Sequence, residues 1–124
     1  MNLAAIRTIL LVLILIFAAQ SPTKCAPSVT AIRVPDGGIQ PQSGVDEKGT
    51  LHLLYFKGDA GSGDLYYVNR AAGKEAFSKP LKVNSSPGSV VARGSIRGGQ
   101  MAVGKAGQIF VVWNASKSVP NYEH

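Results

Sequence analysis

The chain has 124 residues, of which 45% are hydrophobic and 16% charged, so its length permits one ordinary domain and excludes a large multidomain enzyme. Its single cysteine excludes an internal disulfide and a multi-cysteine zinc site, because either needs at least two thiols. The net charge of +6 comes from 13 Lys and Arg residues, scattered without a run, against 7 Asp and Glu residues. We therefore expect no nucleic-acid partner.

The first segment predicts a secretory signal peptide. Residues 9–19 form an uninterrupted apolar run that follows Arg7 and ends before polar residues. The run is shorter than the ~20 apolar residues that usually span a membrane. We expect residues 1–21 to be a signal helix, the mature chain to be secreted or periplasmic, and no stable membrane insertion after cleavage; an uncleaved anchor is the alternative. The residues before Cys25 lack the leucine and small residue of a lipidation site, so we expect no lipid anchor there.

The following residues carry strand and turn signals and no helical period. Residues 22–41 contain four prolines and predict an extended, Pro/Gly-rich lead-in. Residues 50–57 and 64–70 are β-rich and predict a hairpin with a glycine-rich loop between them. Residues 77–84 are a third strand candidate. Pro80 lies inside it and cannot donate a ladder hydrogen bond, so this strand should lie at a sheet edge.

The last strand candidates reveal an internal repeat. Residues 100–103 and 108–114 predict a further hairpin. Residues 42–55 and 100–113 share the pattern Gln-x-x-Val-x-x-x-Gly-x-aliphatic-x-aliphatic-aliphatic-aromatic at an offset of 58 residues. A repeat of about four strands is typical of a propeller blade, and the loop at 84–96 would hold the excess length.

The predicted fold is therefore all-β. We expect antiparallel four-stranded blades of an incomplete β-propeller, with a first blade and its long loop over 42–96 and the start of a second, truncated blade over 97–124. Two blades cannot close a propeller, so the sequence is interpreted as an amino-terminal fragment or a truncated product.

Three sequence features resemble the sialidase-like (neuraminidase, BNR-repeat) six-bladed β-propellers, a family of secreted glycoside hydrolases. Arg33-Val34-Pro35 resembles the Arg-Ile-Pro motif, and residues 46–51, Asp-Glu-Lys-Gly-Thr-Leu, resemble the first-blade turn. Residues 69–77 resemble an Asp-box, although Ala71 replaces its aspartate. Arg33 also lies further from the first-blade turn than the family spacing implies.

The resemblance implies a site that binds a sugar carboxylate. Arg33 is the substrate-binding candidate from the motif, Arg97 follows from the repeat register, and Arg93 is a weaker third; arginine suits the task because its planar fork meets a carboxylate with two hydrogen bonds. Asp59 and Asp64 are the catalytic candidates, since the family carries its acid in this region. The alternatives are solvated arginines and aspartates that only make the turn. Two carboxylates are also weak evidence for calcium, so we expect no metal and no cofactor.

Other polar and aromatic residues have structural interpretations. His52 lies on the opposite strand face to its leucine neighbours, without a partner fixed by spacing. Tyr55 and Trp113 occupy equivalent repeat positions and favour core packing over a sugar platform. Asn84 and Asn114 each begin a glycan-acceptor pattern.

The leading functional hypothesis is a fragment of a secreted sialidase-like hydrolase of the exo-sialidase type, inactive alone. The alternative is a non-catalytic secreted β-propeller for carbohydrate or protein recognition, which the altered Asp-box and displaced arginine favour. Either function implies a glycan or glycoconjugate partner. Open sheet edges would meet the remaining blades or, in a small secreted β protein, lead to self-association.

Overall fold

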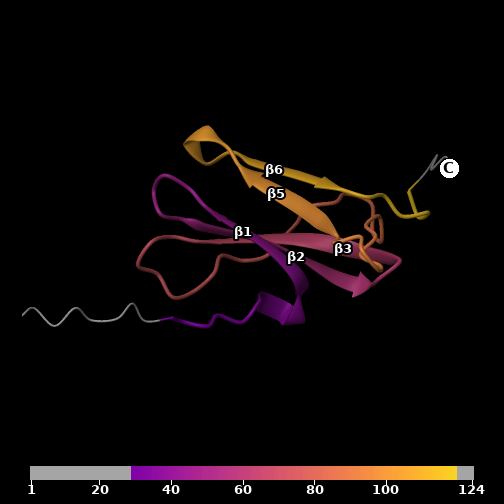
Figure 1. Ribbon diagram of the computed structural model, residues 1–124, viewed down its shortest axis with the longest axis horizontal. Coiled ribbons are helices and arrows are strands. Elements are labelled where there is room, and N and C mark those ends of the chain that lie inside the picture. Colours follow the sequence, from indigo (N-terminus) through magenta and orange to yellow (C-terminus); the bar gives the residue numbers. More distant parts are fainter. Residues whose placement is uncertain (1–28, 120–124) are drawn as a thin grey trace, which may run out of the picture. The chain divides into compact units, whose positions relative to one another are not determined.

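The computed structural model describes residues 29–119 (Figure 1). The described strands all lie within one compact unit, Ile32–His124. The elements are η1 (Pro35–Gly37), β1 (Ile39–Val45), β2 (Leu51–Asp59), β3 (Ser62–Arg70), β4 (Leu81–Lys82), β5 (Gly99–Val103), η2 (Lys105–Gly107) and β6 (Ile109–Trp113). Both η elements are three-residue turns, so the prediction of an all-β fold is confirmed for the described residues. The predicted signal helix and Cys25 lie outside them.

Strands β1 to β4 form one antiparallel sheet in the order β1-β2-β3-β4, here called the four-stranded sheet. The β1–β2 turn is closed by Asp46, whose Oδ1 accepts hydrogen bonds from the backbone N–H of Lys48 (2.9 Å) and Thr50 (2.8 Å). Gly49 completes the turn with a φ of 76°, a left-handed conformation that favours glycine. These contacts set the register in which Val45 pairs with Leu51.

The glycine-rich segment between β2 and β3 is strand rather than loop. The ladder continues through Gly58 paired with Gly63 to Asp59 paired with Ser62, which leaves a two-residue turn. The expectation of a longer loop was wrong because Gly63 lies directly beneath the ring of Phe56, where a side chain would clash. Absence of a side chain here allows pairing to continue to the end of the hairpin.

The proline-containing strand is much shorter than the sequence predicted. Only Leu81 and Lys82 pair with β3, opposite Tyr67 and Tyr66. Pro80 lies just before β4, and β4 is the last strand in the sheet order, so the predicted edge position is confirmed.

Strands β5 and β6 form a second antiparallel hairpin with the register of β1 and β2. Val103 pairs with Ile109 and Gln100 with Val112; subtracting 58 from each number gives the pairs Val45–Leu51 and Gln42–Leu54 of the first hairpin. The turn glycines also correspond, since Gly107 has a φ of 74° where Gly49 has 76°. The structure thus confirms that the two repeat copies predicted from the sequence fold as equivalent hairpins.

The second hairpin lies as a separate layer over one face of the four-stranded sheet (Figure 1). The core between the layers contains Leu54, Phe56, Leu65, Val90 and Ala92, against which Met101 and Val111 of the second hairpin pack. The contact is close because Gly99 and Gly44 lack side chains: a Cβ at Gly99 would lie 2.7 Å from Leu65 Cδ1.

The opposite face of the four-stranded sheet has a smaller core. Leu53, Tyr55 and Val68 are buried there, and Val34 and Phe77 pack against them. Tyr55 occupies a core position, as the repeat predicted, whereas its counterpart Trp113 is 38% exposed.

Candidate functional site

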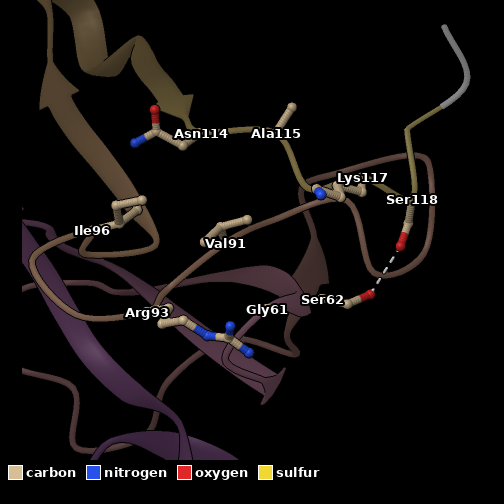
Figure 2. A pocket seen from close by; sticks show the side chains of 9 residues that line it. All are labelled: Gly61, Ser62, Val91, Arg93, Ile96, Asn114, Ala115, Lys117 and Ser118. Atoms are coloured by element: carbon tan, nitrogen blue, oxygen red, sulfur yellow. Dashed lines mark hydrogen bonds between the residues drawn. The ribbon is translucent and has the colours of Figure 1, made fainter. Parts of the chain in front are cut away.

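A hollow of about 710 Å³ lies where three segments meet (Figure 2). The β2–β3 turn, the segment 91–96 and the chain after β6 supply its walls. The lining residues are Gly61, Ser62, Val91, Arg93, Ile96, Asn114, Ala115, Lys117 and Ser118. We call this hollow the Arg93–Lys117 pocket.

Backbone hydrogen bonds fix the frame of the Arg93–Lys117 pocket. Val90 exchanges two bonds with Gly63 at the end of the four-stranded sheet (2.9 and 3.0 Å) and also bridges to Ala115 beyond β6. The Val91 N–H donates to the Asn114 carbonyl at 3.1 Å, and the Ala92 N–H donates to the carbonyl of Ala60 at 2.8 Å. One short segment therefore joins the two sheet layers directly beneath the pocket.

Hydroxyl groups line one side of the Arg93–Lys117 pocket. Ser62 Oγ lies 3.1 Å from Ser118 Oγ, as the dashed line in Figure 2 marks, and donates to the Gly88 carbonyl at 3.0 Å. Ser116 is buried behind them; its Oγ also donates to the Gly88 carbonyl and accepts the Ser118 N–H at 3.2 Å. The two lining hydroxyls are thus held in place by groups behind them.

The lining carries two positive charges and no carboxylate. Arg93 and Lys117 enter from different segments, as Figure 2 shows. Among the described residues, ion pairs join Lys57 to Asp36 and Lys82 to Asp64, and His52 Nε2 lies 3.3 Å from Asp46 Oδ2. Arg93 and Lys117 take part in none of these contacts, so neither cation of the pocket is held in an ion pair among the described residues.

Asp59 adjoins this pocket through Gly61. Its Oδ1 accepts the Gly61 N–H at 2.8 Å, which is a turn-forming contact, and the side chain is exposed. A Cβ at Gly61 would lie 3.2 Å from Arg93 Nη2 and 3.3 Å from Asp59 Oδ1, so these two charged groups approach the same glycine. Of the sequence candidates, Asp59 and Arg93 are therefore brought close together.

Asp64 is held in a structural network instead. Its Oδ1 accepts bonds from Asn84 Nδ2 (2.7 Å) and the Gly88 N–H (2.8 Å), and its Oδ2 lies 3.0 Å from Lys82 Nζ. Burial raises the pKa of Asp64, but the hydrogen bonds from Asn84 and Gly88 and the charge of Lys82 outweigh it, so the pKa is lowered overall. Such a carboxyl is ionised at neutral pH, whereas a general acid must hold a proton.

The other predicted arginines lie elsewhere. Arg33 lines a hollow of about 200 Å³ on the face of the four-stranded sheet that carries Leu51 and Leu53. Arg97 is exposed and precedes β5, next to Gly98, which approaches Phe56 on the opposite face. Neither hollow is lined by both arginines, so the structure does not bring Arg33 and Arg97 into one site within the described residues.

Contacts between polar side chains link Asp46, the buried His52 and Tyr67. His52 Nε2 lies 3.3 Å from Asp46 Oδ2, and His52 Nδ1 lies 2.7 Å from the Tyr67 hydroxyl. Backbone hydrogen bonding from Thr50 is the main reason that the pKa of Asp46 is lowered. The hairpin register could have identified the partner of His52. Gly44 pairs with His52, and Asp46 follows two residues after Gly44, at the end of the β1–β2 hairpin where His52 lies. Neither hollow described here is lined by these groups, which favours a structural role.

The two glycan-acceptor patterns differ in accessibility. Asn84 is 2% exposed, and its Nδ2 is surrounded by oxygens of Asp64, Ser86 and Ser89. Asn114 is exposed at the rim of the Arg93–Lys117 pocket. Only Asn114 presents its amide to solvent in the folded chain.

Sequence reasoning missed Lys117 and Ser118 as lining residues. They reach the Arg93–Lys117 pocket because Ala115 pairs with Val90, a contact between distant segments that no local pattern signals. In the described part of the chain, no three His, Cys, Asp or Glu side chains gather as metal ligands, and no helix has the length and hydropathy to cross a membrane.

Comparisons with protein-family models, curated proteins and solved structures found no match to this chain. The resemblance to sialidases therefore rests on the sequence motifs alone.

Proposed function

We propose that this chain is a secreted recognition module of β-propeller type that binds acidic sugars in the Arg93–Lys117 pocket. The observation that carries the proposal is the pair of cations, without a carboxylate partner among the described residues, in a hollow shared with fixed hydroxyls. The volume of about 710 Å³ falls within the ~300–1,000 Å³ range of small-molecule sites.

Each part of the Arg93–Lys117 pocket suits one part of such a ligand. The planar guanidinium of Arg93 can meet a carboxylate with two parallel hydrogen bonds, and Lys117 adds a second positive charge. Ser62 and Ser118 can exchange hydrogen bonds with sugar hydroxyls. Val91 and Ile96 offer apolar contact to the carbon face of a sugar ring.

The repeated hairpins support the propeller part of the proposal. A four-stranded antiparallel meander has the strand order of a blade, and an equivalent hairpin stacks on its face. The apolar run at residues 9–19 supports secretion.

Sialidase-like hydrolysis is the second candidate, and the motif resemblance favours it. Hydrolysis needs a carboxylic acid that holds a proton. The lowered pKa of Asp64 does not suit that role, which leaves Asp59 beside the pocket as the candidate. Binding without turnover is therefore the primary proposal.

Calorimetric titration with sialyllactose and with neutral lactose tests whether the Arg93–Lys117 pocket binds acidic sugars. We expect binding of sialyllactose only, and affinity reduced about tenfold or more by Arg93→Ala and by Lys117→Ala, because each removes a charged hydrogen-bond donor. Lys79→Ala is the matched control, since Lys79 is an exposed cation outside the lining. Equal binding of lactose, or unchanged affinity in both pocket variants, would contradict the proposal. Turnover of a fluorogenic sialoside that is lost in Asp59→Asn would favour the hydrolase instead.

A further inference from the structure

Charge is unevenly divided along the described chain. Residues 29–75 carry five Lys and Arg residues and six Asp and Glu residues, so their charges nearly cancel. Residues 76–119, which we call the acid-free segment, carry six Lys and Arg residues and no Asp or Glu. This segment supplies both cations of the Arg93–Lys117 pocket and a further exposed arginine, Arg97.

A tight turn holds Arg97 close to Arg93. The N–H of Ile96, a lining residue of the pocket, donates to the Arg93 carbonyl at 3.0 Å. Gly94 allows this turn with a φ of 61°, a left-handed conformation that favours glycine. The Cα atoms at the two ends of such a turn lie within about 7 Å of each other, and Arg97 follows the second end directly. Positive charge therefore continues beyond the pocket along the chain.

The Arg93–Lys117 pocket is open to solvent over most of its lining. Seven of its nine lining residues are exposed, among them both cations and Ser118. Its volume of about 710 Å³ also lies in the upper part of the ~300–1,000 Å³ range of small-molecule sites. An open hollow of this size lets a sugar chain enter on one side and leave on another, so the bound sugar need not be the end of its chain.

Asp59 favours one direction for such a chain. Its carboxylate approaches Gly61 on the β2–β3 turn, so a chain with several acidic groups would meet a like charge there. The acid-free segment offers Arg97 instead. An anionic chain that leaves the pocket is therefore stabilised on the side of Arg97.

We propose that the Arg93–Lys117 pocket binds an internal stretch of an acidic polysaccharide, with a carboxylate on successive sugar units, and that Arg97 contacts the unit outside the pocket. The inference rests on the proposed function, because it assumes that the pocket binds acidic sugars. Repeated carboxylates allow each arginine fork to meet an acidic group of its own. The lining residues that the structure describes include hydroxyl and aliphatic groups but no aromatic ring on which a nucleic-acid base could stack, which favours a sugar chain over single-stranded nucleic acid.

Calorimetric titration with tetragalacturonate, a chain of four uronic acid units, tests this inference beside the sialyllactose titration. We expect tetragalacturonate to bind about tenfold or more tightly than sialyllactose, because a further acidic group meets Arg97. Arg97→Ala should weaken tetragalacturonate binding about tenfold more than sialyllactose binding, and Arg97→Lys, which keeps the charge, should recover part of the loss. Lys105→Ala is the matched control: it removes an exposed cation of the acid-free segment beyond the other end of β5 and should leave both affinities unchanged.

The results separate this inference from the proposed function. If sialyllactose binds but tetragalacturonate binds no more tightly, or if Arg97→Ala weakens both equally, the inference fails and the proposed function stands. If neither ligand binds, both fail. An equal loss of tetragalacturonate affinity in Lys105→Ala would assign binding to diffuse charge, and overturns the inference. Equally tight binding of a single-stranded DNA oligonucleotide with the same number of charges would assign the surface to nucleic acid, and overturns it too.

Discussion

Asn84 shows at the residue scale how buried polar groups fix a loop in this protein. Its Oδ1 accepts the buried N–H of Leu65 at 2.9 Å, and its Nδ2 faces oxygens of Asp64 and Ser89. Asn84 thus attaches the loop between β4 and Val90 to β3, together with the bonds that Asp64 and Ser62 make to Gly88, and Val90 in turn supports the Arg93–Lys117 pocket.

The Asp64 network predicts a stability that falls in acid. The pKa of Asp64 is lowered in the folded chain, whereas an unfolded aspartate has a pKa of about 3.9. Its stabilising contribution is therefore present above about pH 5 and is lost as the pH falls through the folded pKa. Asp46, whose pKa is also lowered, acts in the same direction. Urea midpoints measured between about pH 2.5 and 7 should rise with pH and level off at about pH 5.

Substitutions isolate the share of Asp64 in this acid dependence. Asp64→Asn should flatten the curve in part, since Asp46 remains. Asn84→Ala should flatten it too and should lower the free energy of unfolding at pH 7 by about 2–3 kcal/mol, because the buried Leu65 N–H loses its acceptor. Asn114→Ala makes the same chemical change at an exposed site and should leave the curve unaltered. If the urea midpoints of Asp64→Asn and Asn84→Ala both depend on pH as steeply as those of the wild type, other groups control acid unfolding.

At the scale of elements, the β2–β3 hairpin depends on one close approach. Gly63 lies beneath the Phe56 ring within the ladder, and its backbone exchanges hydrogen bonds with Val90. The same residue therefore closes the hairpin and anchors the segment that joins the two layers.

Gly63→Ala should strongly destabilise the protein. The added methyl group would overlap the Phe56 ring, and displacement of this core side chain should cost about 1–3 kcal/mol. Ala60→Ser in the exposed turn next to it is the control and should change stability by less than about 0.5 kcal/mol. Thermal unfolding of both variants measures the difference. Equal midpoints for Gly63→Ala and the wild type would show that the ring moves aside without cost.

The elements that could be predicted from the sequence are those with local signals. Alternating apolar residues and turn glycines located β2, β3 and the second hairpin, and the repeat even placed Gln100 in register with Gln42. The extent of the β2–β3 ladder could not be predicted, because glycines usually indicate a loop and their role here depends on the Phe56 ring. The pairing of Val90 with Ala115 joins segments that are distant in the sequence, so no local pattern predicts it. The position of Lys117 depends on this pairing and could not be predicted either.

At the scale of the whole described unit, the sheet layers and the Arg93–Lys117 pocket share one support. Val90 bonds to the four-stranded sheet on one side and bridges to the chain after β6 on the other, so the pocket lies where the two layers are joined. A ligand that holds Arg93 and Lys117 together would therefore also hold the two layers together. This coupling predicts that a bound acidic sugar raises the unfolding midpoint.

The most direct test of the account is an amide-resolved NMR titration of the chain with sialyllactose, with lactose as the reference. We predict saturable shifts at Gly61, Val91, Arg93 and Lys117 with sialyllactose, no saturable shifts there with lactose, and loss of the sialyllactose shifts in Arg93→Ala. Shifts that gather instead around Arg33 or Arg97, or that occur equally with lactose, would contradict the assignment of the Arg93–Lys117 pocket as an acidic-sugar site.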